Sequence, residues 1–363
     1  MHIGLIIYGS LATLTGGYIY DRILVDYMRQ RGHQVEIISL PHRRLGSHLL
    51  DTFYSRLAKD SAALQFDLLL QDELCHPSLW RVNHRLRKKA HFPVVAVVHQ
   101  VRCRQPRSRL LNRIYEAVER PYLNSVDAFV FNSNTTRQTV EKLVAGCRPA
   151  VVAYPAGDRL GCLGSLERIE SRAMSPGPLR LIFVGNLLPN KGLLPLIQGL
   201  SRLPSESWQL TVAGSLGMDR RYSRRVQKLV VAQNVRQQVA LVGLVDGPEL
   251  ASLLARSHVF IMPYSHEGFG MAHLEAMGFA LPVIGSSSGA VKEFVLPERN
   301  GFLIDPGDVE TTLACLKRLN HDRQLLVKMS RSALQTFHER PHWRDTMEIV
   351  HRFLWELVNK KLV

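Results

Sequence analysis

Short apolar runs that alternate with amphipathic segments are the feature that most constrains how this chain can fold. The first run, 3–8, ends at Gly9, and the pair Gly16 and Gly17 opens a segment whose apolar residues recur at helical spacing. A second run follows at 35–40. A strand, a turn, a helix and a strand in this order join two parallel strands, so the pattern predicts a parallel sheet.

The alternation continues in two series, which predicts two α/β domains, each with a doubly wound parallel sheet. Further runs in the first series lie at 66–70, 93–99, 128–133 and 150–154. Runs in the second series lie at 180–185, 208–214, 239–243, 259–264 and 281–286. Between the series, 158–178 has no clear period and is interpreted as a linker. We therefore expect an N-terminal domain over 1–157, a C-terminal domain over 179–343 and an amphipathic helix over 344–361.

The composition is typical of a globular chain without disulfide bonds or membrane spans. Of the 363 residues, 46% are hydrophobic and 21% are charged, close to the average of folded domains. The five cysteines are odd in number and never stand in C-x-x-C spacing, which argues against a disulfide framework and a zinc site. No apolar run approaches the ~20 residues of a membrane helix, and the start lacks the features of a secretory leader. We therefore expect a cytoplasmic protein.

Positive charge is concentrated in one part of the sequence. The net charge is +15, and the segment 81–113 contains basic residues but no aspartate or glutamate. Its basic residues are Arg81, Arg85, Arg87, Lys88, Lys89, Arg102, Arg104, Arg107, Arg109 and Arg113. Such a segment attracts phosphate groups, and we prefer an anionic membrane surface, on the inner face of the membrane, as its partner. A solvated basic surface is the alternative, and nucleic acid is disfavoured because few aromatic residues interleave the charges.

The segment 263–308 carries the residues from which a chemistry can be inferred. An expected buried strand ends at Pro263, and a glycine-rich loop then leads into a helix. This turn contains Glu267, Gly268, Phe269, Gly270 and Met271. Free amide groups and the positive end of the helix dipole bind anions at such a turn. Glu275 follows about one helical turn after Met271, and carboxylates accept hydrogen bonds from sugar hydroxyls. The pattern predicts a nucleotide diphosphate-sugar laid across the start of the helix.

The run EGFGMAHLEAMGFALPVIG, 267–285, closely resembles the signature of the retaining glycosyltransferases of sequence family four, in which seven residues separate two glutamates. In that family the first glutamate contacts the transferred sugar and the second holds the ribose, so the resemblance implies these roles for Glu267 and Glu275. It also implies the GT-B fold, with two Rossmann-like domains that face each other across a cleft and a C-terminal helix that returns to the first. The donor would lie mainly on the second domain and the acceptor on the first.

Other motifs of the chain are similar to elements of the same family. The run FVGNLLPNKG, 183–192, resembles an element in which an arginine and a lysine bind the diphosphate. Lys191 matches the lysine, whereas Asn186 stands where the arginine is expected. The pair Gly16 and Gly17 resembles a glycine turn near the acceptor and the donor phosphate, and His99 resembles a histidine beside the donor sugar.

The run SSSGAVKE, 286–293, resembles a family element near the nucleotide, which would place Glu293 and Asn300 near the base or ribose. His266 and His273 flank the key glutamates, but no third ligand stands at suitable spacing, and the sequence has no D-x-D element. We therefore expect no metal and no cofactor.

Together these features predict a retaining hexosyltransferase with Glu267, His99 and Lys191 as catalytic residues. A UDP-sugar is the expected donor, and a lipid-linked, polysaccharide or small-molecule hydroxyl is the expected acceptor. The alternative is a catalytically weak or inactive subunit that keeps the fold and binds a nucleotide or a partner, which the missing arginine at Asn186 would explain.

Overall fold

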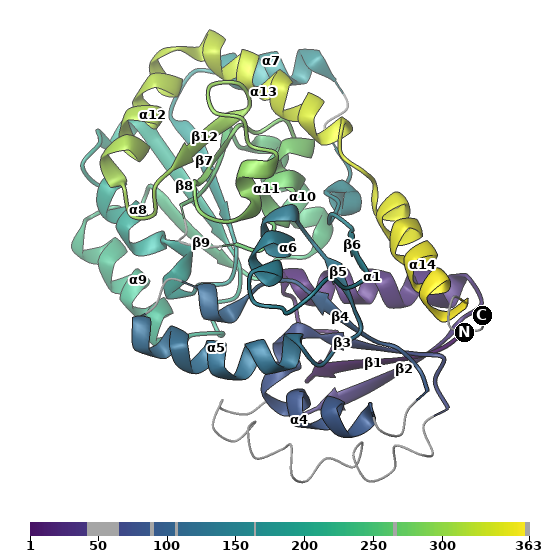
Figure 1. The fold of residues 1–363 in the computed structure, drawn as a ribbon. Helices are drawn as coiled ribbons and strands as arrows, with labels where there is room; N and C mark the ends of the chain where they lie inside the picture. The colour runs from purple at the N-terminus through teal and green to yellow at the C-terminus, as the bar shows by residue number, and fades with distance from the viewer. Residues whose placement is uncertain (42–64, 88–90, 106–107, 163–164, 264–266, 360–363) are drawn as a thin grey trace. The chain divides into compact units, whose positions relative to one another are not determined.

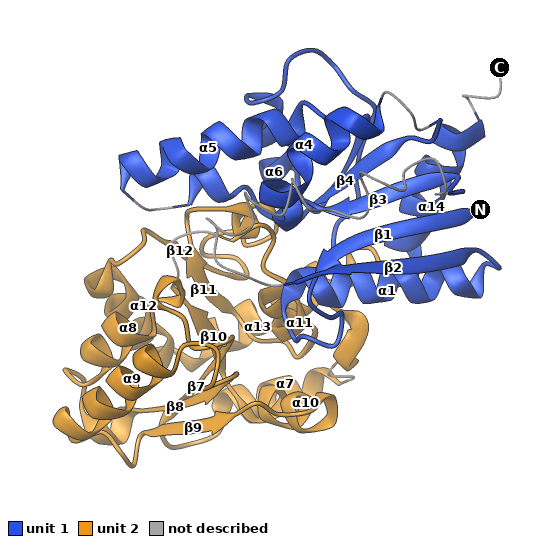
Figure 2. Ribbon diagram, turned by 90° about the horizontal axis from the view of Figure 1, so that it is seen from below, with its two compact units in different colours: residues 1–155, 343–363 blue, residues 156–342 orange. Residues whose placement is uncertain are grey.

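The computed structural model describes residues 1–41, 65–87, 91–105, 108–162, 165–263 and 267–359. The chain divides into two compact units (Figure 1, Figure 2). Unit 1 contains residues 1–155 and 343–363, and unit 2 contains residues 156–342. Each unit is built around a parallel sheet of its own.

The sheet of unit 1 has six strands within the described residues, in the order β2-β1-β3-β4-β5-β6, and every pair is parallel. The strands are β1 (His2–Tyr8), β2 (Gln34–Leu40), β3 (Leu68–Asp72), β4 (Val94–Val98), β5 (Ala128–Phe131) and β6 (Ala150–Val152). Every residue of β3, β4 and β5 is buried, which explains why these strands read as continuous apolar runs. The strand order reverses between β1 and β3, and open α/β sheets bind ligands at such a point.

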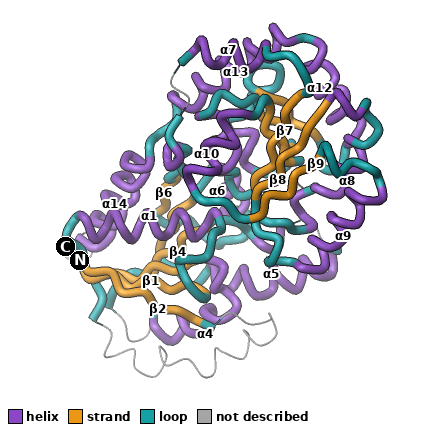
Figure 3. Tube along the Cα trace, turned by 180° about the vertical axis from the view of Figure 1, so that it is seen from behind, coloured by secondary structure: helices purple, strands orange, loops and turns teal. Residues whose placement is uncertain are grey.

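Helices cover the sheet of unit 1, and the last helix of the chain packs on the first. The helices are α1 (Gly16–Gln30), α4 (His76–Leu86), α5 (Arg109–Leu123), α6 (Asn134–Glu141) and α14 (Trp343–Asn359), with short 3-10 turns η1 (Glu73–Cys75) and η2 (Arg102–Arg104). Helix α14 lies beside α1 (Figure 1, Figure 3). The rings of Tyr20 and Trp343 are 5.6 Å apart, and Thr346 donates a hydrogen bond to the carbonyl of Tyr154 at 2.7 Å. These contacts bury one side of the C-terminal helix within unit 1.

The sheet of unit 2 also has six parallel strands within the described residues, in the order β12-β11-β10-β7-β8-β9. The strands are β7 (Leu179–Val184), β8 (Trp208–Ala213), β9 (Val239–Gly243), β10 (Val259–Met262), β11 (Val283–Ser286) and β12 (Gly301–Ile304). Strands β7 and β10 are neighbours although they are not consecutive. The strand order of this sheet therefore reverses between them, and we call this place the switch point. The expected fold of two doubly wound parallel-sheet domains is therefore confirmed.

Helices of unit 2 connect its strands and pack on one another. Helix α8 (Leu193–Leu200) contacts α9 (Arg220–Ala232) and α12 (Val309–His321). Helix α13 (Arg323–His338) contacts α7 (Leu166–Met174) and α11 (Met271–Gly278). The remaining elements are α10 (Gly247–Arg256), η3 (Asp158–Leu160), η4 (Pro189–Lys191), η5 (Ser205–Ser207) and η6 (Ala290–Glu293). No helix in the described part of the chain is both long and apolar enough to cross a membrane.

The interpretation of 158–178 as a linker is wrong, because η3 and α7 occupy it and belong to unit 2. Ser165 caps α7 by accepting a hydrogen bond from the amide of Arg168, and Ile169 and Ala173 bury one side of the helix. The glycines and prolines of this segment only bracket the helix, and they obscured its short amphipathic pattern.

Candidate functional site

The switch point of the unit 2 sheet gathers residues from loops that are distant in sequence. Val259 and Phe260 of β10 pair with Leu181 and Ile182 of β7, so the loops that follow these two strands leave the same edge of the sheet. The loop after β7 ends in η4 with Lys191, and the loop after β10 contains Glu267.

Lys191 and Glu267 meet at this edge. The Lys191 Nζ donates a hydrogen bond to Glu267 Oε2 at 2.7 Å. Their side chains are 17% and 23% exposed, so the pair is sheltered but reachable. A cation and a carboxylate that share an accessible site can separate to bind a phosphate and a sugar hydroxyl, respectively.

Glycines hold the backbone of this site in a geometry that other residues would disrupt. Gly192 has φ +73°, and a Cβ there would lie 2.0 Å from the carbonyl oxygen of Pro263. Gly289 has φ +92°, and a Cβ there would lie 2.5 Å from the carbonyl oxygen of Glu267. That same carbonyl accepts the amide of Ala290 at 3.1 Å. Lys191 and Glu267 are thus fixed by the close backbone approach that glycine permits.

Glu275 lies on α11 and is almost buried, with 5% of the residue exposed. Both the Nε and a terminal nitrogen of Arg159 lie 2.9 Å from its Oε1. Burial raises the pKa of Glu275, and the charge and hydrogen bond of Arg159 oppose that rise. Because both arginine contacts use Oε1, Oε2 retains capacity for another donor, such as a ribose hydroxyl. Arg159 lies in the segment taken as a linker, and no sequence motif pointed to it.

The turn into α11 has the backbone geometry of an anion site. Gly270 caps the helix with φ +99°, and no side chain caps the first turn. Phe269 is 2% exposed and packs on Phe294, with ring centroids 5.2 Å apart, so only its backbone could contact a ligand. The predicted binding residues Gly268, Gly270 and Met271 continue this same turn.

His273 lies beneath this turn and is fully buried. Its ring packs against Phe260 at 4.8 Å, and a Cβ at Gly270 would lie 2.9 Å from its Nδ1. Burial and the charge of Lys191 lower the pKa of His273 to about 3, so the imidazole is neutral at pH 7. His273 therefore supports the turn as a neutral packing residue, and His266 lies outside the described residues.

Asn186 has a backbone role that an arginine could not fill. Its Oδ1 accepts a hydrogen bond from the amide of Ser215 at 3.1 Å, and the amide of Leu187 donates to the carbonyl of Ser215 at 3.2 Å. The loops after β7 and β8 are joined in this way. Since arginine has no acceptor, it could not make the first of these bonds.

Asn300, which the resemblance places near the base or ribose, has its side chain hydrogen-bonded within unit 2. It is fully buried, and its Nδ2 donates to the carbonyl of Phe294 at 2.9 Å and to the hydroxyl of Thr336 at 2.8 Å. Its Oδ1 accepts the amide of Leu296 at 2.7 Å. These bonds use the donors and the acceptor of the amide to fold the turn before β12. Glu293 is partly exposed at the end of η6.

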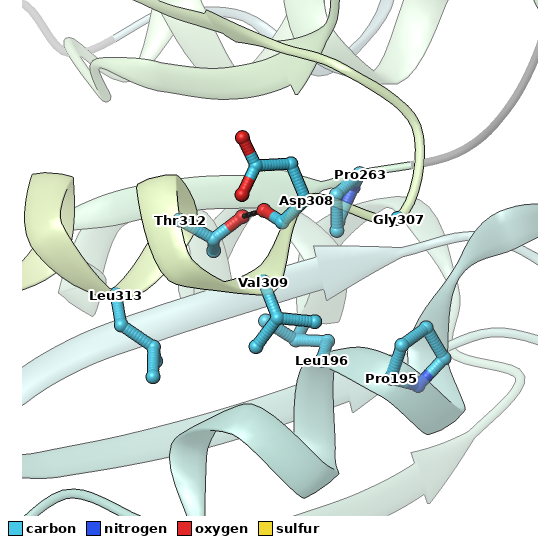
Figure 4. A pocket seen from close by; sticks show the side chains of 8 residues that line it. All are labelled: Pro195, Leu196, Pro263, Gly307, Asp308, Val309, Thr312 and Leu313. Carbon is cyan, nitrogen blue, oxygen red and sulfur yellow. Dashed lines mark hydrogen bonds between the residues drawn. The ribbon is translucent and has the colours of Figure 1, made fainter.

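A small pocket adjoins the site between α8 and α12 (Figure 4). Its volume is ≈ 10 Å³, and its lining residues are Pro195, Leu196, Pro263, Gly307, Asp308, Val309, Thr312 and Leu313. A nucleotide needs a site of hundreds of Å³, so this pocket is too small to hold one.

Unit 1 brings its own predicted residues together at the start of α1. A Cβ at Gly17 would lie 3.0 Å from the ring of His99, so glycine allows the imidazole to lie against the helix. His99 Nε2 lies 2.8 Å from Asp21 Oδ1, and Asp21 is fully buried. Burial alone would lower the pKa of His99, but Asp21, with Asp72 and Glu73, raises it to about 9. The imidazole is therefore a cation at pH 7, and Asp21 is a residue that the sequence analysis missed.

A cluster of buried acids adjoins His99. Burial raises the pKa of Asp72 and Glu73 to about 7 and that of Glu119 to about 8. The charge of a neighbouring carboxylate adds to each rise, whereas the hydrogen bond with Glu119 opposes the rise in the pKa of Glu73. Glu119 accepts the amides of Arg102 and Cys103, both at 2.7 Å. At neutral pH these acids are therefore protonated to a large extent, whereas an exposed carboxylate would be ionised.

His76 joins Glu73 and Glu119, and the possible ligand atoms of these three buried residues lie within 4.8 Å of one another. Burial lowers the pKa of His76 to about 4, and its Nδ1 lies 3.0 Å from the carbonyl of Glu73. The raised pKa of Glu73 and Glu119 indicates that the two carboxyl groups share a proton, which reduces their negative charge. We therefore interpret the three residues as part of the fold and not as a metal site.

Several arginines of the basic segment 81–113 have partners within unit 1, so the positive charge of this segment is partly compensated. The guanidinium of Arg81 lies over the ring of Trp80, Arg87 pairs with Asp127 at 3.0 Å, and Arg104 pairs with Glu116 at 3.7 Å. Lys88, Lys89 and Arg107 lie outside the described residues, and Arg109 and Arg113 are exposed on α5.

Two family descriptions match this chain, one in each unit. "Glycosyltransferase Family 4" matches residues 20–156, and "Glycosyl transferases group 1" matches residues 167–336. A sulfoquinovosyl transferase of Arabidopsis thaliana is 30% identical over 181 residues, 49% of this chain and 33% of that protein. A glycogen synthase of Mycobacterium tuberculosis is 26% identical over 271 residues, 72% of this chain and 64% of that protein. The matches thus span from one third to less than two thirds of these relatives.

Solved structures extend the likeness of fold to the whole chain. A sucrose-phosphate synthase of Thermosynechococcus elongatus has a TM-score of 0.82 at 19% identity, covering 99% of both chains. The Anabaena protein HepE, solved in complex with UDP and glucose, has a TM-score of 0.77 at 16% identity, covering 98% of this chain and 99% of that one. Both structures have the GT-B fold. From the two family matches and this fold we conclude that the chain belongs to the group 1 glycosyltransferases of sequence family four.

Proposed function

We propose that this protein is a retaining glycosyltransferase that moves a hexose from a nucleotide diphosphate-sugar to an acceptor hydroxyl. The observation that carries the proposal is the pairing of Lys191 with Glu267 at the switch point of the unit 2 sheet, beside the uncapped start of α11. A cation and free amides suit a diphosphate, and a carboxylate suits the hydroxyls of a sugar.

Each residue of the site has a task in the transfer. Lys191 and the amides at Gly270 and Met271 would stabilise the negative charge that develops on the departing diphosphate. Glu267 would accept hydrogen bonds from the transferred sugar, and Glu275, oriented by Arg159, would accept them from the ribose. The acceptor hydroxyl would enter on the face that the diphosphate leaves, and its proton would pass to the departing phosphate.

His99 would act in unit 1 as a cationic donor to a bound ligand. Its Nε2 is bound to Asp21, and the structure gives its Nδ1 no hydrogen-bond partner among the described residues. A charged Nδ1–H can bind a sugar hydroxyl or a phosphate oxygen. We assign His99 this binding role, with Gly16 and Gly17 giving the ligand access to the start of α1.

A UDP-sugar is the donor that we propose, because the Anabaena structure of similar fold was solved with UDP and glucose. For the acceptor we propose a polysaccharide or a lipid-linked hydroxyl, since relatives of the chain are named glycogen synthase and sulfoquinovosyl transferase. No metal takes part in this scheme, because Lys191 and the helix amides supply the positive charge.

The test is transfer or hydrolysis of a UDP-sugar by the purified protein. Glu267→Gln keeps the size of the side chain but removes its charge, and we expect a loss of activity on the order of 100-fold or more. Glu206→Gln, at an exposed turn of the same unit, is the matched control and should be unchanged. Equal activity of both variants would refute the role of Glu267.

A weak or inactive binding subunit is the second candidate, because Asn186 replaces the expected arginine. The bond from the amide of Ser215 to Asn186 accounts for this residue without loss of function. Measured binding of UDP without turnover of any UDP-, GDP- or ADP-sugar would favour the subunit over the enzyme.

A further inference from the structure

Helix α5 exposes large apolar side chains that its own unit does not cover. Leu110 is 71% exposed, Ile114 47% and Leu111 38%. Leu110 and Ile114 stand one turn apart, and the exposed Ala117 and Pro121 continue the same line along the helix. Aliphatic residues gathered on one side of an exposed helix mark an interaction surface.

The opposite side of α5 fixes the helix firmly in unit 1. Tyr122 and Leu123 are fully buried, and the helix packs on α4. The buried Glu119 accepts the amides of Arg102 and Cys103 in η2, both at 2.7 Å. The helix therefore does not need its exposed aliphatic residues in order to pack.

Arginines form a second line next to the apolar one. Arg109, Arg113 and Arg120 recur at helical spacing and are exposed. None of them forms an ion pair with another described residue, whereas Glu116, the acid beside them, is paired with Arg104 at 3.7 Å. The surface of α5 thus combines an apolar line with a line of uncompensated positive charge.

We propose that α5 docks on an anionic lipid bilayer, with Leu110 and Ile114 at the boundary of the acyl chains and the three arginines at the lipid phosphates. Helices with one apolar and one basic side lie in the membrane interface in this way. The docking surface is α5 itself, not the whole basic segment 81–113, because Arg81, Arg87 and Arg104 have partners inside the unit.

The charges favour a bilayer over two other occupants. Two copies that met through α5 would bring their arginine lines together, and the whole chain already carries +15. A nucleic acid would match the charge but not Leu110 and Ile114, which offer no ring on which a base could stack. An anionic bilayer complements both lines at once.

The docking can be tested without any transferase activity, so its failure is distinct from failure of the proposed function. Full-length protein is sedimented with vesicles of phosphatidylcholine, alone or mixed with phosphatidylglycerol. We expect binding to the mixed vesicles and little to the neutral ones. The double variant Leu110→Gln/Ile114→Gln should weaken binding by about tenfold or more, as expected for the loss of two buried aliphatic chains. The variant Arg109→Gln/Arg113→Gln should weaken it by about tenfold and make it less sensitive to salt.

A matched control lies on α7 of unit 2, where Leu166 and Met174 are 58% and 47% exposed. Leu166→Gln/Met174→Gln should bind vesicles as the unchanged protein does. A second readout is the fluorescence of Ile114→Trp, which should shift to shorter wavelength when mixed vesicles are added.

Three outcomes would overturn the proposal. The first is no binding of the unchanged protein to mixed vesicles, and the second is equal binding of the Leu110/Ile114 variant. The third is a dimer in solution that this variant dissociates, which would make α5 a contact between copies of the chain.

Discussion

Replacing Asp21 by asparagine should convert His99 from a cation into a neutral residue at pH 7. Asp21 Oδ1 lies 2.8 Å from His99 Nε2, and both residues are buried, so little solvent screens the pair. Burial lowers the pKa of His99, and Asp21 is the main group that raises it to about 9. Asparagine keeps an acceptor at the same place but carries no charge. The pKa should therefore fall to about 6.5 or below, a change of at least about 3 kcal/mol in the free energy of protonation.

The sign of the stability effect follows from the raised pKa. His99 stabilises the folded unit fully below its unfolded pKa of about 6.5, and this contribution is lost as the pH rises through about 9. The Asp21→Asn variant lacks that contribution. It should be less stable than the unchanged protein at pH 6, and the difference should shrink by pH 10.

Two measurements test this prediction. Nitrogen-15 spectra of labelled histidines, assigned with His99→Gln, give the pKa of His99 directly, and urea unfolding gives the stability at each pH. Asp26→Asn is the control, because Asp26 lies exposed on the same helix. The reasoning is refuted if His99 titrates near pH 6.5 in the unchanged protein or at the same pH in Asp21→Asn.

Four further predictions concern the buried acids and the donor site. Because the pKa of Glu73 is raised to about 7, its ionisation lowers the stability of the folded protein as the pH rises from about 4.5 to 8. The Glu73→Gln variant lacks this ionisation, so over that pH range it should lose less stability than the unchanged protein, by up to about 3 kcal/mol. Urea unfolding at several pH values measures the difference. Gly192→Ala should lower both Tm and the affinity for UDP, because the added Cβ would lie 2.0 Å from the carbonyl oxygen of Pro263. Gly161→Ala is the control: its φ is also positive, +79°, but no atom of the described residues lies near the added Cβ, so only Tm should fall, and by less. Glu275→Gln should weaken UDP binding by about tenfold, measured by calorimetry, and an unchanged Kd would exclude a ribose contact. Treatment with EDTA should leave transferase activity unchanged, and activity that returns only with a divalent metal would contradict the scheme.

The fold was predictable because parallel strands are buried on both faces. The runs 93–99 and 259–264 contain β4 and β10, whose residues are all buried, and such strands need apolar residues at every position. Helix α7 was missed although its apolar and polar residues are separated as in an amphipathic helix. It has only nine residues, and the glycines and prolines on either side of it are typical of a loop.

The candidate site was predictable where its residues belong to one motif. Glu267 and Gly270 stand in a single turn whose glycines and carboxylate could be read together. Arg159 could not be found in this way, because it lies 116 residues from Glu275 and only the folded chain brings them together. The internal hydrogen bonds of Asn300 could not be predicted, because an Asn-Gly pair has the same sequence pattern whether it lines a site or folds a turn.

Asp21 had a signal that the sequence analysis did not use. It stands one helical turn after Gly17, on the buried side of α1 with Leu24 and Met28. A carboxylate in such a position needs a partner, and His99 at the end of a neighbouring buried strand supplies it.

Calorimetric titration of UDP into the protein tests the central claim most directly, namely that a diphosphate binds at the switch point of unit 2 beside Lys191. Lys191→Met keeps the aliphatic part of the side chain and removes its charge. Lys292→Met is the control, because it removes an exposed charge from η6 of the same unit. The account predicts that UDP binds the unchanged protein, that Lys191→Met weakens binding by about tenfold or more, and that Lys292→Met has little effect. Equal Kd values for the two variants, or no heat of binding with UDP, GDP or ADP, would contradict it.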